Sequence, residues 1–421
     1  MLDFDFLEDM ARKPFISLNC GTFRTYEPFN ASNILTADPQ NIQAILATKF
    51  HDFDFGPERV INFSAMLGDG IFTAPLQRWP HFRAQLKPQF TRDQVSDLEA
   101  ADRHMQVMFR ALPDEDQEGW VQSVDIKPLL YRYTMDVSTE FLFGKSVNSQ
   151  TTAIHSLESS VTASKKAAED QKFAEAMDFA QGYIADRMRL FGYFWLMNSK
   201  EFQEACKTVK DYADRFVAAA LDPNHKPSTE KYVFLDALVA ETRNPIELRD
   251  QVLQVLLAGR DSTASLLSWT VLLLSRDPAA YQKLREAIIS NFGTESSPTQ
   301  ELTISSLRSC KELTHVIYES LRLYPLVPLN SRRAIRDTVL PTGGGPNRNE
   351  PIAVREGELV AFTSYVVQRR PDIWGPDSEE FVPSRWEGRK LGWEYTPFSG
   401  GPRVCIGRKL TLRYDFEELK S

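Results

Sequence analysis

Cysteine is scarce in this chain of 421 residues, and no two of its four cysteines form a CxxC pair. Such wide spacing excludes a dense disulfide framework and a structural zinc site, and it fits a reducing compartment. Positive charge is also in deficit, because 49 basic residues face 57 acidic ones and the formal net charge is -8. A general nucleic-acid binder would be basic, so we expect no nucleic-acid partner.

We also expect no signal peptide at the start of this sequence. Its first nine residues, MLDFDFLED, are acidic and too interrupted to form a signal peptide or a membrane anchor. Internal repeats and long low-complexity tracts are absent from the sequence as well. With 42% hydrophobic and 25% charged residues, the composition is typical of a globular chain, as one large domain or as two or three smaller ones.

One long apolar run is present, at residues 252–274. Asn244 as N-cap and Pro245 at the first helical position predict a helix start, and an Arg-Asp-Pro sequence after the run predicts its end. A membrane span is the competing interpretation, but Arg260 and Asp261 in the middle would each be costly in lipid. We therefore predict a buried central helix of about 31 residues, roughly 46 Å long.

The rest of the pattern is mainly helical. Helical periodicity is clearest at residues 94–111, 156–190 and 306–324, and strand-like pieces are short, at 34–37, 339–341 and 359–363. Polar interruptions predict loops at 222–230, 291–299 and 341–350. We therefore predict a mainly α fold class, with a helix-dominated single domain and a small β-sheet region formed from distant segments.

Near the C-terminus, one cysteine stands in a frame of glycines, in the sequence Phe398-Ser-Gly-Gly401-Pro-Arg403-Val-Cys405-Ile-Gly407. A thiolate that binds a heme iron needs hydrogen-bond donors and a close approach of the backbone, which glycine permits. Arg403 is placed to hold a propionate in bidentate fashion. The alternative is a glycine-rich turn with an ordinary buried cysteine.

These five positions resemble the heme-ligand signature of cytochrome P450 enzymes. The resemblance implies a single cytochrome P450 domain over residues 1–421 that binds heme b (iron protoporphyrin IX). It implies that Cys405 is the metal ligand and that the other four positions contact the cofactor. Family members bind O2 at the iron and receive electrons from NADPH through NADPH-cytochrome P450 reductase. The implied reaction is a monooxygenation, in which one oxygen atom enters a C–H bond of a hydrophobic small-molecule substrate.

The middle of the predicted central helix carries Gly259, Asp261, Ser262 and Thr263. Gly259 leaves room for a ligand against the backbone, and an acid followed by a hydroxyl suits proton delivery. The segment resembles the oxygen-activation motif of the family, which implies catalytic roles for Asp261, Ser262 and Thr263. Serine stands at position 262 where threonine is usual. The alternative is that both hydroxyls bond back to carbonyls one turn earlier.

Glu319 and Arg322 are placed at i,i+3 on one helical face. Such a pair alone is usually solvated and says little. Together with Arg385 downstream, the spacing resembles a structural Glu–Arg–Arg cluster of the family. The resemblance implies that this cluster fixes the loop that carries Cys405 and does not contact substrate.

Trp79 and Arg83 are placed at i,i+4, which is also one helical face. They resemble the pair with which the family binds a heme propionate through indole and guanidinium donors. The alternative is a core tryptophan beside a surface arginine. We expect His81, between them, to be a spectator and not a metal ligand.

Several segments narrow the resemblance. Segments 41–46, 67–73, 87–90, 258–261 and 340–345 resemble the fungal branch that hydroxylates n-alkanes and fatty acids, and the likeness extends over about residues 19–410. It departs at Pro75-Leu76 and at Phe82. The implied substrate is a long aliphatic chain oxidised at or near its terminal carbon, and a specialised metabolite is the alternative. The residues themselves indicate only an apolar pocket, with lining from Val255, Leu256, Ala258, Val327 and Leu329.

Basic residues cluster around the cysteine frame: Arg389, Lys390, Arg403, Arg408, Lys409 and Arg413. A basic patch there would steer an acidic reductase domain to the heme edge. The alternative is ordinary solvated charge. We expect a monomer, and the family resemblance implies a place at the cytosolic face of the endoplasmic reticulum membrane.

Both ends differ from the family pattern. Most fungal members begin with a membrane anchor, and they continue after the cysteine through a full helix and further strands, whereas this chain stops at Ser421. We therefore expect a P450 domain that is incomplete at both ends and C-terminally truncated. A truncated relative without turnover is the alternative to a monooxygenase. An isomerase or peroxygenase that needs no reductase is a third option.

Overall fold

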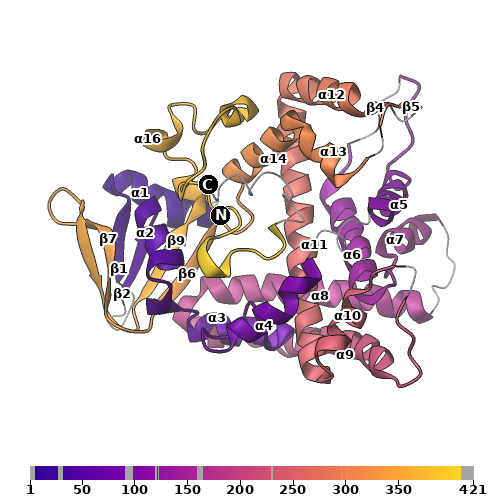
Figure 1. Cartoon of the computed structure of the whole chain (residues 1–421), viewed down its shortest axis with the longest axis horizontal. Helices are drawn as coiled ribbons and strands as arrows, with labels where there is room; N and C mark the ends of the chain where they lie inside the picture. Colours follow the sequence, from indigo (N-terminus) through magenta and orange to yellow (C-terminus); the bar gives the residue numbers. More distant parts are fainter. Residues whose placement is uncertain are drawn as a thin grey trace. The chain divides into compact units, whose positions relative to one another are not determined.

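The computed structural model describes residues 5–26, 32–90, 98–118, 121, 123–158, 165–228, 231–294, 296–300 and 302–408. They form two compact units: unit 1 comprises Met1–Gly56 and Trp269–Ser421, and unit 2 comprises Pro57–Ser268. Helices dominate the chain and strands are few (Figure 1). The predicted mainly α class is thereby confirmed, while the single domain stays a prediction.

Unit 1 contains a five-stranded sheet with strand order β1-β2-β9-β6-β3. Its strands are β1 (Thr22–Tyr26), β2 (Ser32–Thr36), β3 (Phe53–Asp54), β6 (Leu329–Ala334) and β9 (Leu359–Thr363). β2 and β9 pair in parallel, with Ile34 opposite Val360, and the other pairings are antiparallel. The predicted strands at 34–37 and 359–363 are confirmed, and the sheet does join distant segments.

The core of unit 1 is built on this sheet. Alternation along β2 buries Ile34 and Thr36 on one face, as expected for a strand with one covered side. Ile34 packs with Ile42 of α2 (Pro39–Gln43) and with Ile45 of the short helix η3 (Ala44–Thr48), all in one hydrophobic cluster. The core therefore holds η3 in a defined position.

The predicted strand at 339–341 lies in β7 (Thr338–Gly344), which pairs antiparallel with β8 (Glu350–Val354). The loop predicted for 341–350 is wrong at its start, because residues 341–344 still belong to β7. The pairing shifts between Leu340 and Gly344, and Gly343 has a φ of +112°. Glycine thus allows an irregular strand to continue where a glycine run suggested a loop.

The other helices of unit 1 are η1 (Phe6–Arg12), α1 (Lys13–Leu18), η4 (Phe50–Asp52), α12 (Pro278–Phe292), α13 (Ile304–Ser309), α14 (Lys311–Leu323), α15 (Ser364–Val367), α16 (Pro371–Trp374), η7 (Pro383–Trp386) and η8 (Gly401–Arg403). The loop predicted for 291–299 holds a short ladder of β4 (Gly293–Thr294) and β5 (Ser297–Pro298). The helix predicted at 306–324 is two helices. Cys310 leaves the helical region, with ψ of 90°, between α13 and α14.

Unit 2 is helical in its described residues, with α3 (Pro57–Leu67), α4 (Trp79–Leu86), η5 (Lys87–Phe90), α5 (Leu98–Phe109), α6 (Ile126–Phe143), α7 (Ser149–Glu158), α8 (Lys165–Arg189), η6 (Phe191–Leu196), α9 (Lys200–Leu221) and α10 (Phe234–Glu241). α8 and α9 pack together, with the rings of Phe173 and Tyr212 stacked 4.0 Å apart. α5 matches the predicted helix at 94–111 in part, and α8 matches the predicted helix at 156–190 in part. Residues 94–97, 159–164 and 229–230 lie outside the described residues.

The predicted central helix is α11 (Pro245–Arg276), 32 residues long. The side chain of Asn244 accepts hydrogen bonds from the backbone N–H groups of Ile246 and Glu247, at 3.1 and 3.3 Å, which confirms the predicted N-cap. Several leucine and valine side chains of its first turns are fully buried. No helix in the described part of the chain is long and apolar enough to cross a membrane.

Candidate functional site

Cys405 is presented on a closed loop of unit 1. All four cysteines lie in the described residues, and Cys405 alone is exposed while the others are buried or half-buried. Its backbone N–H donates to the carbonyl of Phe398 over 2.9 Å, and the N–H of Val404 donates to the carbonyl of Gly401 over 3.0 Å. A sulfur donor held at the surface by its own backbone fits an axial ligand of a heme iron, and it does not fit an inert core thiol.

Gly401 is required by a close contact inside the protein. Its φ of +63° lies in the left-handed region that favours glycine. A Cβ at this position would lie only 1.9 Å from the carbonyl oxygen of Leu46 in η3. The sequence analysis expected glycine in this frame to permit a close approach of the backbone to a heme, but a side chain at 401 would already collide with η3. Gly401 therefore lets the Cys405 loop pack on η3. Gly407 lies in the turn that follows Cys405.

Arg403 is buried, with 6% of its side chain exposed. Its Nη2 lies 3.1 Å from Oδ1 of Asp54, and its Cζ lies 4.1 Å from the centre of the Phe55 ring. Burial lowers the pKa of Arg403 to about 10, against the raising effect of the Asp54 charge. The residue predicted to hold a propionate thus already pairs with a carboxylate of the chain. Nothing in the sequence indicated Asp54, which is 349 positions away.

A second guanidinium contacts the same aromatic ring. Arg332 of β6 is 5% exposed, and its Cζ lies 4.6 Å from the centre of Phe55. Its Nη1 donates to Oδ1 of Asn330 over 3.0 Å. Two guanidiniums on one ring make this part of unit 1 positive and suited to an anionic group such as a propionate. The sequence analysis missed Arg332, because a strand arginine carries no distinctive signal.

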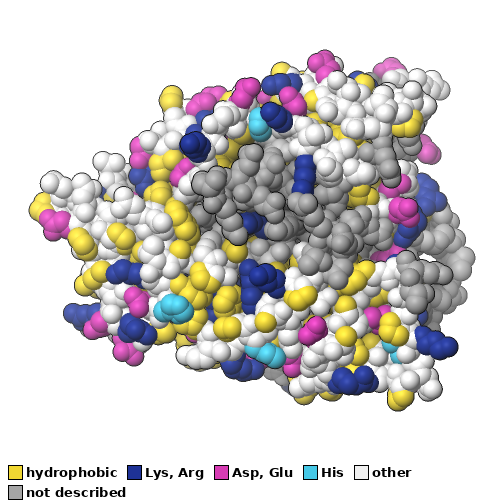
Figure 2. All heavy atoms as spheres, viewed as in Figure 1, with side chains coloured by type: hydrophobic (Ala, Val, Ile, Leu, Met, Phe, Trp, Pro, Cys, Tyr) yellow, Lys and Arg dark blue, Asp and Glu magenta, His cyan; other side chains and the backbone are white. Residues whose placement is uncertain are grey.

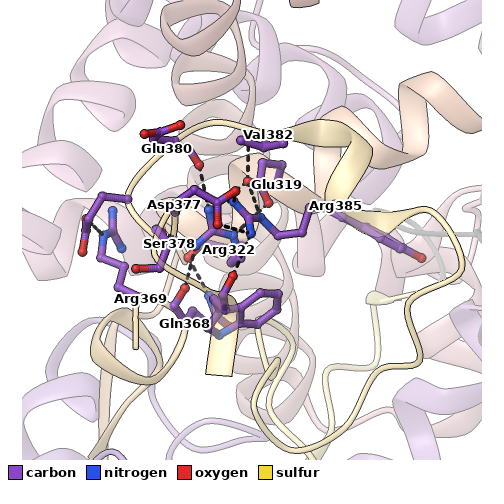
Figure 3. Close-up of polar contacts among 12 residues, drawn as sticks. Glu319, Arg322, Gln368, Arg369, Asp377, Ser378, Glu380, Val382 and Arg385 are labelled. Atoms are coloured by element: carbon purple, nitrogen blue, oxygen red, sulfur yellow. Dashed lines mark hydrogen bonds and ion pairs between the residues drawn. The ribbon is translucent and has the colours of Figure 1, made fainter. Parts of the chain in front are cut away.

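The Glu–Arg–Arg cluster has the predicted geometry. Glu319 and Arg322 on α14 are fully buried, and Nε and Nη2 of Arg322 each donate to Glu319 over 2.8 Å. Nε of Arg385, from η7, lies 3.2 Å from Oε1 of Glu319. Figure 3 shows how the three side chains meet. The prediction that these three residues form one cluster is confirmed.

The hydrogen-bonding capacity of this cluster is largely used (Figure 3). Arg322 also donates, at 2.6–2.9 Å, to three backbone carbonyls: those of Gln368, Ser378 and Glu380. Glu319 accepts two more bonds, from the N–H of Val382 and the indole N–H of Trp386. A buried ion pair is costly unless its remaining bonds are made, so this arrangement is a structural brace between α14 and residues 368–386.

Gln368 connects the cluster to the Cys405 loop. Its fully buried side chain donates to the carbonyls of Leu321 and Arg322 over 3.0 and 2.9 Å, and its Oε1 accepts from the N–H of Thr396 over 3.3 Å. The carbonyl of Thr396 then accepts from the N–H of Ser399. This path supports the expectation that the cluster fixes the loop. The sequence analysis missed Gln368, whose role depends on neighbours far along the chain.

Asp261 belongs to a charged group in unit 2. Arg260, 3% exposed, lies 2.6 Å from Oδ1 of Asp178 on α8 and 3.3 Å from Oδ1 of Asp261. Burial raises the pKa of Asp261 to about 6, opposed by the charge of Arg260 and reinforced by that of Asp178. This carboxyl can therefore take up and release a proton near neutral pH.

The hydroxyl of Ser262 donates to the carbonyl of Ala258 over 2.5 Å, which is the back-bond of the alternative interpretation. Thr263 is half-buried at the next position. α11 is continuous through Gly259, where an added Cβ would lie 3.4 Å from Oγ of Ser138 on α6. Such a separation is an ordinary van der Waals contact, and Gly259 is exposed, so the room for a ligand beside it stays a prediction. The catalytic roles of Asp261, Ser262 and Thr263 stay predictions.

Trp79 and Arg83 do share one face of α4. Cζ of Arg83 lies 5.8 Å from the centre of the Trp79 ring, and Trp79 is 8% exposed. Nε2 of the exposed His81 lies 2.8 Å from Oε1 of Glu247 on α11. The placement of the pair is confirmed, and its contact with a propionate stays a prediction.

The predicted basic patch is not one exposed surface. Arg403 is buried, and Cζ of Arg389 lies 4.0 Å from the centre of an indole ring, whereas Lys390 is exposed. Two members lie outside the described residues: Lys409 and Arg413. On the face drawn in Figure 2, basic and acidic side chains are interspersed. The prediction of an exposed basic patch is therefore wrong for Arg403, because its guanidinium pairs with Asp54 inside unit 1.

The residues expected to line an apolar pocket differ widely in exposure. Leu256 is fully buried in unit 2 and has no accessible surface to offer a ligand, so this expectation is wrong for Leu256. Val327 in unit 1 is 54% exposed. Three residues are intermediate in exposure: Val255, Ala258 and Leu329.

The chain is similar to known proteins over most of its length. The family model for cytochrome P450 matches residues 19–412. Cytochrome P450 monooxygenase g430 from a Fusarium species is 49% identical over 409 residues, which cover 95% of this chain and 71% of that protein. Cytochrome P450 52A4 of Candida maltosa is 43% identical, covering 90% of this chain and 70% of that protein. For cytochrome P450 52A12 of Debaryomyces hansenii the identity is 42%, with 90% and 73% covered.

Proposed function

The chain belongs to the cytochrome P450 family, and from that premise we propose that it hydroxylates long aliphatic molecules. The reaction would insert one oxygen atom of O2 into a C–H bond at or near the terminal carbon of a fatty acid or an n-alkane-like chain. The observation that carries this proposal is Cys405, the one exposed thiol of the chain, held on a closed loop within the family signature.

The substrate class rests on segments that resemble the alkane and fatty-acid branch. One of them, residues 67–73, packs on α11 within unit 2. The N–H of Asp69 donates to Asp250 over 2.9 Å, and the N–H of Phe72 donates to Gln254 over 2.7 Å. α11 also carries residues 258–261, a second segment of this resemblance. Two parts of the branch pattern are thus joined in one structural feature, which supports the proposal.

The residues of unit 1 fit a bound heme. When bound, heme b supplies the activation of O2, with electrons from NADPH through a reductase. Sγ of Cys405 would hold its iron, and Arg332 and Arg403 would neutralise a propionate. Cys405 is flanked in the sequence by Phe398, which is buried, and by Gly407. In unit 2, the indole N–H and guanidinium of the predicted pair on α4 are the proposed donors to a propionate.

Proton delivery would begin at Asp261. With a pKa of about 6, its carboxyl oxygen can hold a proton at neutral pH in part of the molecules and release it again. Ser262 donates its own proton to Ala258, so its oxygen lone pairs stay available to accept a proton or a water. Arg260, held by Asp178, would keep the carboxyl oriented, and Thr263 would supply a second hydroxyl.

Electron delivery and location follow the family pattern in this proposal. An acidic reductase domain would approach the exposed side of the Cys405 loop, where Lys390 and Arg408 offer positive charge. We propose that the protein works as a monomer with NADPH-cytochrome P450 reductase at the cytosolic face of the endoplasmic reticulum membrane.

The test is the spectrum of the reduced, carbon-monoxide-bound protein, followed by turnover of dodecanoic acid with a P450 reductase. We expect the long-wavelength Soret band of a thiolate-ligated heme and a hydroxylated product. Cys405→Ala should lose both, whereas Cys20→Ala, a half-buried cysteine of unit 1, should keep both. A Cys405→Ala variant that still hydroxylates would falsify the mechanism. An intact spectrum without product from fatty acids or alkanes would overturn the substrate class alone.

A further inference from the structure

Unit 2 contains a cavity of about 520 Å³ that none of the residues discussed so far explains. It is lined by side chains of α3, α8, α9 and the first turns of α11. Four basic and two acidic side chains reach it, together with apolar side chains. Its volume is within the range of small-molecule sites in proteins, roughly 300–1,000 Å³.

The decisive residue is Arg187, at the end of α8. It is only 5% exposed, and its Nε has no hydrogen-bond partner. Its Cζ lies 5.4 Å from the centre of the Phe194 ring and 5.2 Å from that of Phe202. Within the described part of the chain, no carboxylate comes within ion-pair distance of Arg187. A buried guanidinium without an anion is costly, so a ligand that supplies the anion would be bound strongly here.

A second cation faces the same cavity. The amine of Lys210 on α9 donates to the carbonyl of Ser64 over 3.2 Å, and within the described residues it makes no ion pair. Burial lowers the pKa of Lys210, and the nearby charge of Arg249 lowers it further. An anion in the cavity would relieve both effects.

The other cations of the cavity are already neutralised. Arg249 lies 2.7 Å from Asp250 and 3.5 Å from Asp214. Lys207 is mostly exposed and pairs with Asp211. Arg187, Lys210 and Arg249 face two carboxylates, those of Asp214 and Asp250. This group therefore carries one net positive charge, which one singly charged anion would balance.

The apolar lining of the cavity indicates which other group the ligand carries. Ile61 and Ala65 of α3 and the ring of Phe202 line it beside the two cations. A compact inorganic anion would leave this surface uncovered, whereas an apolar body would bury it. The planar guanidinium of Arg187 also matches the two oxygens of a carboxylate.

We propose that this cavity binds an amphipathic monocarboxylate, with its carboxylate at Arg187 and Lys210 and its apolar body against Ile61 and Ala65. The site lies within unit 2, and the proposal does not depend on heme chemistry at Cys405. Binding here would make the protein sensitive to the level of free organic acids.

Photolabelling of the holoprotein tests this with a matched pair of probes. One is 4-(trifluoromethyl-diazirinyl)benzoate, and the other is the corresponding benzyl alcohol, which has the same shape without the charge. We expect the benzoate to label peptides of α3 or α9 saturably, and the alcohol to label them about tenfold less, as loss of one charge-assisted contact implies. Decanoate should compete for this labelling, and decanol should not.

Variants of Arg187 locate the anion. Arg187→Gln should reduce benzoate labelling of α3 and α9 about tenfold, and Arg187→Lys should retain most of it. Arg189→Gln, an exposed arginine of the same helix that pairs with Asp186, is the charge-matched control and should label like the natural chain. Thermal unfolding of each variant identifies any loss of labelling that comes from misfolding. If Arg187→Gln does not fold, the labelling of Arg187→Lys tests the proposal.

Two results would overturn the proposal. Equal labelling by the acid and the alcohol would mean an apolar site without an anion requirement. Competition by inorganic phosphate at the same concentration as decanoate would mean that the cavity selects compact anions. Because the readout is covalent labelling of unit 2, both results are independent of whether the protein hydroxylates anything.

Discussion

At the scale of single residues, the free energy of unfolding of this protein depends on how a few buried charges are paired. Glu319 and Arg322 have no exposed surface. Together they form hydrogen bonds with groups of α14, η7 and two connecting segments. Such a pair adds little beyond what apolar residues of the same shape would contribute, but removal of one partner leaves a bare charge in the core.

Glu319→Gln therefore should destabilise the fold strongly. We expect the free energy of unfolding to fall by about 3–5 kcal/mol, because Arg322 would keep its charge without a counterion. Urea denaturation of the natural chain and the variant measures this. Glu312→Gln, on the same helix, is the matched control and should change the free energy by less than about 0.5 kcal/mol. Equal effects of the two substitutions would contradict the structural role of the cluster.

Asp261 gives a prediction on pH. Its pKa is raised to about 6 from 3.8, so the native state binds its proton more tightly than the unfolded state does. Ionisation of Asp261 therefore costs stability as pH rises from about 4 to 6, by roughly 1–3 kcal/mol above that range. Asp261→Asn cannot ionise, and Arg260 keeps Asp178 as a partner. We expect this variant to gain stability over the natural chain across that window and to hold the gain at pH 7.

The check is denaturant unfolding of both proteins at several pH values between 4 and 8. Asp186→Asn replaces an exposed aspartate of α8 and should show no such pH-dependent difference. A difference between Asp261→Asn and the natural chain that is the same at every pH would contradict the raised pKa.

At the scale of elements, the Cys405 loop is positioned by its contact with η3. Glycine at 401 is needed twice, for its positive φ and for the close approach of the Leu46 carbonyl. η3 in turn is held by the core under the five-stranded sheet. The Cys405 loop therefore depends on an N-terminal element that no local sequence pattern connects with it.

Gly401→Ala separates these two requirements when it is compared with Gly357→Ala. Gly357 also has a positive φ, +82°, but a Cβ there would meet nothing within 4 Å. We expect Gly357→Ala to cost about 1–2 kcal/mol for the left-handed backbone alone. Gly401→Ala should cost more than about 4 kcal/mol, because the collision with η3 adds to the backbone strain. Urea denaturation measures both, and equal costs would contradict the role of the η3 contact.

At the scale of the whole molecule, the chain forms two compact units, and α11 supplies residues to both. The residues 245–268 belong to unit 2 and the residues 269–276 to unit 1, within one unbroken helix. Splitting the units would require this helix to end in its middle, which would expose eight or more helical groups at once. We therefore expect the units to unfold together.

Hydrogen exchange measures this cooperativity. Amides of β9 in unit 1 and of α9 in unit 2 should become accessible through the same global transition. Glu319→Gln, in unit 1, should then reduce protection in both elements by the same free energy. Loss of protection in β9 alone would show that the units unfold separately, and the single-domain prediction would be wrong.

Features that depend on neighbours in the chain were readable from the sequence. The N-cap of α11, the i,i+3 pair on α14 and the i,i+4 pair on α4 follow from helical geometry, and each is found as predicted. The predicted bounds of helices and loops were wrong where the conformation of one backbone position overrides the periodicity of the sequence. Cys310 separates α13 from α14, and Gly343 lets β7 continue through a glycine run.

The sequence by itself determined the family and the long central helix and predicted the thiol ligand, because each rests on residues spaced within one or a few turns. Only the tertiary structure decided how buried charges are balanced: Arg403 by Asp54, Arg260 by Asp178, and Arg187 by no carboxylate of the described residues. The physical reason is that a desolvated charge needs a counterion at a few ångströms, and folding brings that partner from anywhere in the chain. Composition and periodicity contain no information on such distant pairs.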